Sequence, residues 1–421
     1  MSSAAIAYPD FLDRLRAAPG LKSAGALEAG LTILALFLFS QGLLGPLLAD
    51  ESDPESSAIL RFIWLPVYAV TILLMLARPA ASVRVLWQNM IVLAFIGLVM
   101  ISVSWSVAPD VTLRRGFALA MTTLFGLWLA SRWSWAALIA IVAGTYIIMA
   151  VLSAMMALAV PSLGVDQAVH AGAWKGIWWE KNTLGAMMAY GAVATLAASL
   201  IQPQHRWAWR LAALFCAALV VLSTSKTALL AMSLGVGGII GIALCRTGFV
   251  LAAITLFIGL TGGILAALIL TIAPLEALEL LGRDATLTGR TDIWAVLVDQ
   301  IRAAPWTGFG YKAYWAAENG PVFWVRQATA WDVPTAHNGW IELGLAVGLP
   351  GMALMAIYYL RALFSALGRV FSGPEAYWAL PVVAMTGLIS ISESNLAQQN
   401  SLSWVLLVAI AAKLAAGRVR G

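Results

Sequence analysis

Residues 248–272 read GFVLAAITLFIGLTGGILAALILTI, an apolar stretch that contains no charged side chain. A helix needs about 20 apolar residues to cross the hydrocarbon core of a bilayer, so this stretch predicts a transmembrane helix. Comparable stretches lie approximately at 26–48, 59–77, 89–106, 116–130, 136–160, 183–201, 210–224, 228–245, 338–360, 378–392 and 401–417. Two of them, 116–130 and 378–392, are shorter than a straight span requires.

The composition supports the same class of protein. Of the 421 residues, 62% are hydrophobic and 11% are charged, whereas a soluble domain has about 25% charged residues. These values exclude a soluble globular enzyme, a disordered chain and a disulfide scaffold. Cys216 and Cys245 lie in apolar stretches and are expected to pack as small buried side chains. We therefore expect an all-α polytopic membrane protein with about 12 transmembrane helices.

The distribution of charge predicts the topology. With the N-terminus in the cytoplasm, the inner segments hold 14 of the 25 Lys and Arg residues but only four of the 20 Asp and Glu residues, as the positive-inside tendency requires. The predicted order is a cytoplasmic tail at 1–25, transmembrane helices 1–9 in 26–272, a periplasmic loop at 273–337, transmembrane helices 10–12 in 338–417, and a cytoplasmic tail at 418–421.

The long periplasmic loop is expected to be a partly helical cap before the tenth span. Ile293, Trp294, Leu297 and Ile301 fall on one helical face. Thr291 suits the N-cap of that helix, and Pro305 ends it.

Charged residues are nearly absent from the interiors of the predicted spans and gather at their outer ends and in the long loop. The cations of interest are Arg114, Arg115, Lys181, Lys226 and Arg290. Two interpretations stay open, because such cations either snorkel or pair with nearby acids, or form a basic rim that binds a lipid phosphate or diphosphate. Arg290 also precedes a predicted helix N-terminus, where free backbone N–H groups favour anions.

Two further residues are candidates for acid–base chemistry. His337 lies in the sequence PTAHNGW (334–340), where the long loop enters a span. It is either a structural boundary residue or a general base that accepts the proton of an acceptor hydroxyl while the cations neutralise a departing phosphate. Glu393, in SESNLAQQN (392–400), either orients such a base or an acceptor sugar, or pairs with an outer cation.

The first predicted outer loop, ADESDPESSA (49–58), is rich in acids: Asp50, Glu51, Asp53 and Glu55. Carboxylates of this kind bind divalent cations, although a solvated acidic turn has the same composition. A metal-dependent lipid-sugar glycosyltransferase that uses this loop would lose activity on substitution of Asp50 or Asp53, or with a chelator.

Several short strings, taken together and in order, resemble those of the O-antigen ligase and Wzy-type polymerase superfamily. They are WSVAPD (105–110) with LRR (113–115), KNTLG (181–185), STSKTALL (223–230), GRTDIW (289–294), GFGY (308–311), and AHNG (336–339) with LG (343–344). The resemblance covers roughly residues 90–400. The KNTLG and S-x-S-K-T forms are closer to ExoQ-like exopolysaccharide polymerases than to ligases.

The resemblance implies transfer of an intact glycan at the periplasmic face of the bacterial inner membrane, from an oligosaccharide linked to undecaprenyl diphosphate. A polymerase passes the chain to a lipid-linked repeat unit, and a ligase passes it to lipid A–core. The resemblance gives His337 the role of base, assigns Arg290, Arg115, Arg114, Lys181 and Lys226 to the diphosphate, and assigns Asn338 and Glu393 to orienting the acceptor.

No cofactor, metal or nucleic acid is expected from the resemblance, whereas membrane lipids, a flippase and chain-length regulator proteins are expected partners. Both termini would lie in the cytoplasm and the active site in the periplasm. A flippase or transporter of lipid-linked glycans is the alternative from another class. It predicts charge deep within a central cavity, and the sequence lacks such charge.

Overall fold

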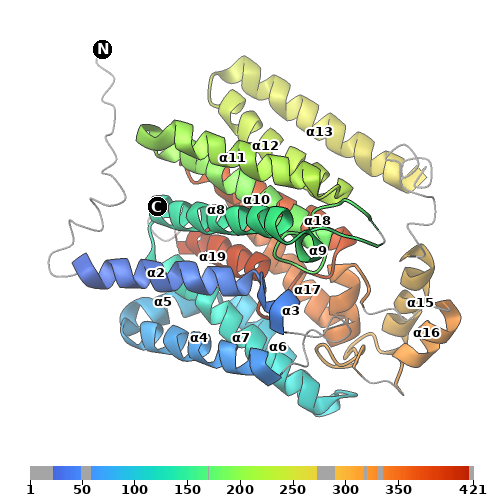
Figure 1. Ribbon diagram of the computed structural model, residues 1–421. Coiled ribbons are helices and arrows are strands. Elements are labelled where there is room, and N and C mark those ends of the chain that lie inside the picture. The colour runs from blue at the N-terminus through green and yellow to red at the C-terminus, as the bar shows by residue number, and fades with distance from the viewer. Residues whose placement is uncertain are drawn as a thin grey trace.

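The computed structural model is helical throughout its described ranges, which are 22–48, 58–168, 170–272, 290–316, 320–329 and 335–416 (Figure 1). Within these ranges the β-structure is limited to an isolated bridge between Val165 and Trp174. The helices are α2 (Lys22–Phe39), α3 (Leu44–Leu48), α4 (Ala58–Leu76), α5 (Pro79–Gln88), α6 (Met90–Ile101), α7 (Pro109–Arg132), α8 (Trp135–Ala159), α9 (Pro161–Gly164), α10 (Lys181–Ile201), α11 (Arg206–Leu222), α12 (Lys226–Cys245), α13 (Phe249–Ile272), α15 (Arg290–Ala303), α16 (Val322–Thr329), α17 (Gly339–Leu367), α18 (Ala376–Ser392) and α19 (Leu402–Ala416). The all-α expectation is confirmed for the described residues.

Every predicted apolar stretch coincides with one or two of these helices, as expected of a polytopic membrane protein. Among the described residues, five helical segments are long and apolar enough to cross a membrane, and the number rises to six if the pair α4 and α5, bent by 103°, forms one span. The five lie at Trp135–Ala159, Lys181–Ile201, Pro203–Leu222, Lys226–Cys245 and Gly339–Leu367. A total of about twelve spans, and the division into tails, loop and spans, stay predictions. Outside the described residues lie 1–21 of the N-terminal tail, the C-terminal tail, and residues 273–289, 317–319 and 330–334 of the long loop, whereas residues 22–25 of the predicted N-terminal tail form the start of α2.

The structure differs from the sequence-based expectation at several helix ends. Helix α7 begins at Pro109 rather than near 116, because the polar residues of its first turns interrupt the apolar run without interrupting the helix. Helix α15 begins at Arg290, before the residue predicted as its N-cap. Helices α5 and α16 were not expected from the apolar pattern, and both are short.

The two ends of the helix bundle differ in their contacts. At one end Glu28 accepts hydrogen bonds from Arg78, at 2.8 Å, and from Arg132. Arg246 of α12 donates to the carbonyl of Gly373, at 2.6 Å, in the turn between α17 and α18. All of these segments were predicted to lie on one side of the membrane. We call this end of the bundle the opposite end, because it lies opposite the site end. The other end, marked by α15 and α16 at the right of Figure 1, is called the site end.

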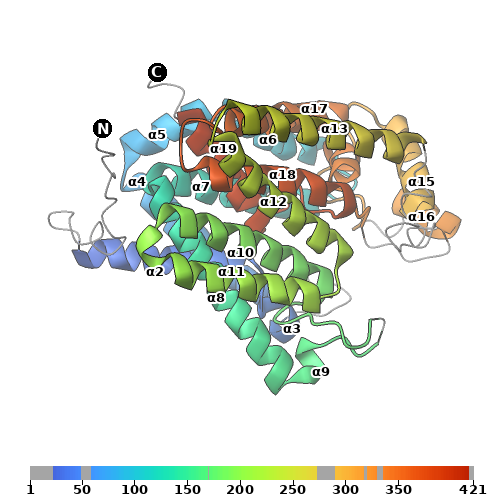
Figure 2. The ribbon, with the colours of Figure 1, turned by 90° about the horizontal axis from the view of Figure 1, so that it is seen from above.

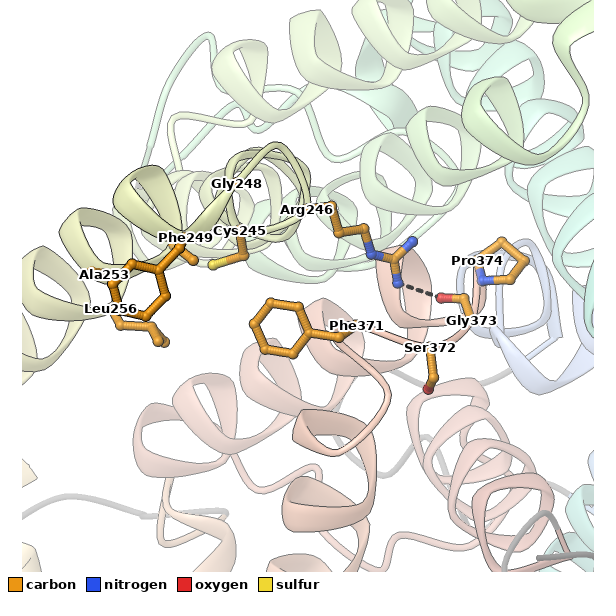
Figure 3. Close-up of a pocket in the computed structure, with 11 residues that line it drawn as sticks. Cys245, Arg246, Gly248, Phe249, Ala253, Leu256, Phe371, Ser372, Gly373 and Pro374 are labelled. Carbon is orange, nitrogen blue, oxygen red and sulfur yellow. Dashed lines mark hydrogen bonds between the residues drawn. The ribbon is translucent and has the colours of Figure 1, made fainter. Parts of the chain in front are cut away.

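A cavity of about 820 Å³ lies at the opposite end, between the start of α13 and residues 371–374 (Figure 3). Phe249, Leu256 and Phe371 line it, and the guanidinium of Arg246 points away from them toward Gly373. None of the predicted site residues lines this cavity.

Helix α17 is broken by a kink that positions the site end. Val347 and Gly348 have non-helical dihedral angles, and Pro350 follows them. Pro350 has no N–H to donate to the carbonyl of Ala346, and the N–H of Leu349 donates instead to Pro305, at 2.7 Å. The carbonyls of Leu345 and Ala346 consequently accept the N–H groups of Phe309 and Gly310, at 2.7 and 3.0 Å. The GFGY loop is thereby docked onto the middle of α17.

Two glycines are required for this docking. Gly348 has φ +65° and ψ −168°, a region that essentially only glycine occupies. A Cβ atom at Gly348 would lie 2.6 Å from the carbonyl oxygen of Pro305. Gly308 has φ +61°, and a Cβ there would lie 2.7 Å from the backbone of Ala346.

We expect Gly348→Ala to lower the stability of the protein by about 1–3 kcal/mol, because the new Cβ meets backbone atoms and the dihedral angles are strained. The thermal unfolding midpoint of the detergent-solubilised protein measures this effect. Gly144→Ala in α8 is the matched control, because a Cβ at Gly144 meets nothing within 4 Å. Equal midpoints for the two variants would contradict the argument.

Candidate functional site

His337 and Glu393 lie next to each other at the site end. The Nδ1 atom of His337 is 3.8 Å from Oε2 of Glu393, and the two side chains are 22% and 27% exposed. His337 lies two residues before the first residue of α17, and Glu393 directly follows α18. The sequence predicted both residues as site residues, and the structure brings them together. A histidine beside a carboxylate, with part of its surface open, has the arrangement of an oriented base.

Asn338 caps the N-terminus of α17. Its Oδ1 atom accepts the N–H groups of Trp340, at 2.9 Å, and Ile341, at 3.1 Å. Asparagine is among the best N-cap residues because its side chain satisfies N–H groups that the first turn leaves free. The oxygen of Asn338 is therefore used within the helix, and only its amide nitrogen is left to orient an acceptor.

Lys181 and Lys226 open two neighbouring helices, α10 and α12. The Nζ atom of Lys181 donates to the hydroxyl of Thr224, at 3.1 Å, two residues before Lys226. Close packing at Gly185, whose Cβ position would meet Ala228, holds the starts of the two helices together. These two predicted cations therefore belong to one basic cluster.

The pairing of α12 with α18 places this basic cluster at the level of Glu393. Near the opposite end, Ile242 and Cys245 of α12 pack in one cluster with Ala376 at the start of α18. Further along, Gly235 lies against Met385. The two helices are therefore antiparallel, so the first turn of α12 lies at the same end as the last turn of α18.

Arg114 and Arg115 are adjacent in the chain, but their side chains make different contacts. Arg114 is exposed and donates to the carbonyl of Asp110 in its own helix, at 3.2 Å. Arg115 is half-buried, and its Nη1 atom is 3.5 Å from the carbonyl oxygen of Lys312, the residue after the GFGY loop. The contact is with the backbone of Lys312, so it links the start of α7 to the chain after the GFGY loop.

Arg290 is the first residue of α15, and its side chain lies outside what the structure describes. The acidic loop with Asp50, Glu51, Asp53 and Glu55 lies outside the described residues as well. The diphosphate role of Arg290 and the metal-dependent alternative therefore stay predictions.

Glu342 is a carboxylate of the site end that the sequence analysis missed. It lies in the first turn of α17, it is 8% exposed, and it accepts the backbone N–H of Ala336, at 2.8 Å, next to His337. A signal was present in the sequence, because an acid in the first turn of a helix within an apolar span is unusual and favours a functional reading.

The segment from Glu393 to Ser401 enters the bundle instead of crossing its surface. Asn400 donates its N–H to the hydroxyl of Thr122, near the middle of α7, at 2.9 Å. Tyr68 of α4 donates to Oδ1 of Asn400, at 2.6 Å, and the Tyr311 hydroxyl donates to the carbonyl of Ala397, at 2.8 Å. Irregular backbone at membrane depth is tolerated where protein groups satisfy it or where it lines a water-filled cavity. Hydroxyl and backbone groups of α4, α7 and the GFGY loop thus hold this irregular segment in place.

The fold and these contacts define a class of protein: an all-helical membrane protein with a histidine–carboxylate pair and lysine and arginine side chains at one end of its bundle. A family model described as "O-Antigen ligase" matches residues 211–356, which include Lys226, Arg290, His337 and Glu342. The match does not extend to Arg115, Lys181 or Glu393.

A curated protein from Rhizobium meliloti (strain 1021), "Exopolysaccharide production protein ExoQ", is 25% identical over 383 residues, which cover 85% of this chain and 82% of that protein. Both comparisons support a resemblance of this chain to the superfamily of O-antigen ligases and ExoQ-like proteins. The resemblance drawn from the short sequence strings is confirmed.

Asn338→Asp is expected to keep the helix cap and to lose the amide donor. Its unfolding midpoint should therefore match that of the native protein, while the KM for the acceptor rises several-fold. Asn338→Ala loses the cap too, and about 1 kcal/mol of stability with it. Thermal unfolding and acceptor titration measure the two effects separately. An unchanged acceptor KM in the aspartate variant would limit Asn338 to capping.

Proposed function

We propose that this protein is a polysaccharide repeat-unit polymerase, which transfers an oligosaccharide from undecaprenyl diphosphate to a sugar hydroxyl of a lipid-linked repeat unit. The observation that carries the proposal is the His337–Glu393 pair at the end of the bundle where Lys181 and Lys226 open their helices. The match of residues 211–356 to the O-antigen ligase family model and the similarity to a protein of exopolysaccharide production over most of its length support it.

The proposed reaction is a displacement at the anomeric carbon of the donor. His337 takes the proton of the acceptor hydroxyl, and the hydroxyl oxygen forms the new glycosidic bond. The bond between the anomeric carbon and the phosphate oxygen breaks, and undecaprenyl diphosphate departs with the electron pair. Glu393 orients His337 and stabilises its positive charge once the proton has been taken.

Cationic side chains neutralise the departing diphosphate in this proposal. The proposed cations are Arg115, Lys181 and Lys226, together with Arg114, which donates within its own helix, and Arg290, whose side chain lies outside the described residues. Fixed positive charge at the position where negative charge develops lowers the barrier, and it does so more strongly where water is excluded. The proposed transfer needs no metal ion.

The proposed setting is the bacterial inner membrane, with both termini in the cytoplasm and the site end at the periplasmic face. Lipid-linked repeat units then reach the site after a flippase has moved them across, and chain-length regulator proteins are proposed partners.

In liposomes that contain the purified protein and lipid-linked repeat units, with a chelator and no added metal, we expect longer glycans and released undecaprenyl diphosphate. His337→Ala should lower the transfer rate by about 100-fold or more, the contribution of a general base. His205→Ala is the matched control, because His205 lies between α10 and α11, beyond the end of α10 that is remote from Lys181. A fully active His337→Ala variant would disprove the role of His337, and loss of transfer with the chelator would favour the metal-dependent alternative.

The second candidate function is an O-antigen ligase, favoured by the printed description of the matching family model. The chemistry is the same and the acceptor differs. We expect extension of lipid-linked repeat units and no product when lipid A–core is the sole acceptor, with products separated by gel electrophoresis. Product on lipid A–core alone would make the protein a ligase, and movement of the donor across the bilayer without any transfer would make it a flippase.

A further inference from the structure

Glu342 is a buried carboxylate whose partners are neutral. It is 8% exposed, and the described residues that donate to it are the backbone N–H of Ala336, the indole of Trp315 and the hydroxyl of Ser394. A buried carboxylate costs several kcal/mol unless hydrogen bonds replace the lost water. The N-terminus of α17, where Glu342 lies in the first turn, adds a favourable dipole.

The donors to Glu342 come from the chain next to both members of the histidine–carboxylate pair. Ala336, which donates to Oε1 at 2.8 Å, directly precedes His337. Ser394, which donates to Oε1 at 3.2 Å, directly follows Glu393. Trp315 donates from the cap, at 3.0 and 3.1 Å to the two carboxylate oxygens. A single carboxylate thus ties together the two loops that carry His337 and Glu393.

The backbone at His337 needs this restraint. His337 has φ +47°, a left-handed conformation that non-glycine residues adopt at a cost. Both backbone polar groups of Ala336, the residue before His337, are held, because Glu342 accepts the N–H of Ala336 and the indole of Trp294 donates to the carbonyl of Ala336, at 2.8 Å. Such a conformation persists only where the surroundings hold it, so losing the Glu342 contact would free His337 to relax.

The surroundings of Glu342 are consistent with a charged carboxylate held in place. It borders a small enclosed cavity of about 10 Å³ together with Lys312 and Tyr314. Burial, and secondarily the negative charge of Glu342, raises the pKa of Tyr314 well above its usual range, so this phenol stays neutral.

We propose that Glu342 is a positioning residue, which fixes His337 and Glu393 at their working separation by holding the loops that carry them. The proposal rests on the proposed function for its effect on catalysis, but its effect on the geometry of His337 is independent of that function. Glutamine at this position keeps one acceptor oxygen and places an N–H₂ group where Trp315 or Ser394 donates.

The test is Glu342→Gln in the full-length protein in liposomes. We expect kcat to fall about 10- to 100-fold, because a misplacement of about 1 Å at a reacting group has an effect of that size. The KM for the lipid-linked donor should stay within about 3-fold of native. Glu28→Gln is the matched control. Glu28 is a half-buried carboxylate at the opposite end, and it accepts from two donors, Arg78 and Arg132. Glu28→Gln should lower the unfolding midpoint and leave kcat unchanged.

A second readout does not depend on transfer. The rate at which diethyl pyrocarbonate modifies His337, measured by peptide mass spectrometry relative to His205, should change at least about 3-fold in Glu342→Gln and stay native in Glu28→Gln. If both kcat and this rate stay native in Glu342→Gln, or if the two variants change alike, the proposal is wrong. If the rate changes while the native protein transfers no glycan, the positioning role stands and the proposed function fails.

Discussion

The carbonyl groups that Pro350 and Leu349 leave unpaired in α17 are the constraint on which the geometry of the site end depends. An unpaired carbonyl within a membrane costs several kcal/mol, and the GFGY loop removes that cost by donating from Phe309 and Gly310. Once this loop is docked, the Tyr311 hydroxyl donates to the carbonyl of Ala397 in the segment after α18. The backbone carbonyl of Lys312 lies next to the guanidinium of Arg115 in α7. A defect in one helix thereby fixes the positions of three other parts of the chain.

Glu342 and Glu393, two carboxylates of the site end, lie in different surroundings, and this difference suits them to different tasks. Glu342 is buried, and neutral donors hold its oxygens, so it serves to hold backbone. Glu393 is partly exposed beside His337, where a change in the charge of the imidazole affects it directly. Environments that separate two carboxyl groups in this way commonly assign them separate roles.

Much of the fold was predictable because the apolar pattern is local. Each apolar stretch became helical, since a helix satisfies its own backbone within the segment. The start of α7 was not predictable in this way, because Thr112, Arg114 and Arg115 continue the helix with polar side chains. Glu342 was missed because its donors Trp315 and Ser394 are 27 and 52 residues away in the chain. Hydrogen bonds over such separations leave no periodic signal.

The sequence by itself determined the class of membrane protein, the resemblance to the O-antigen ligase and ExoQ-like superfamily, and His337, Glu393 and most of the cations as candidates, because composition and short strings carry this information locally. Only the tertiary structure decided which candidates meet. The antiparallel packing of α12 against α18 brings the basic cluster of Lys181 and Lys226 to the level of Glu393. The kink in α17 and the hydrogen bonds of Glu342 set His337 beside Glu393. These positions follow from satisfying buried polar groups across distant segments, which no single stretch of sequence specifies.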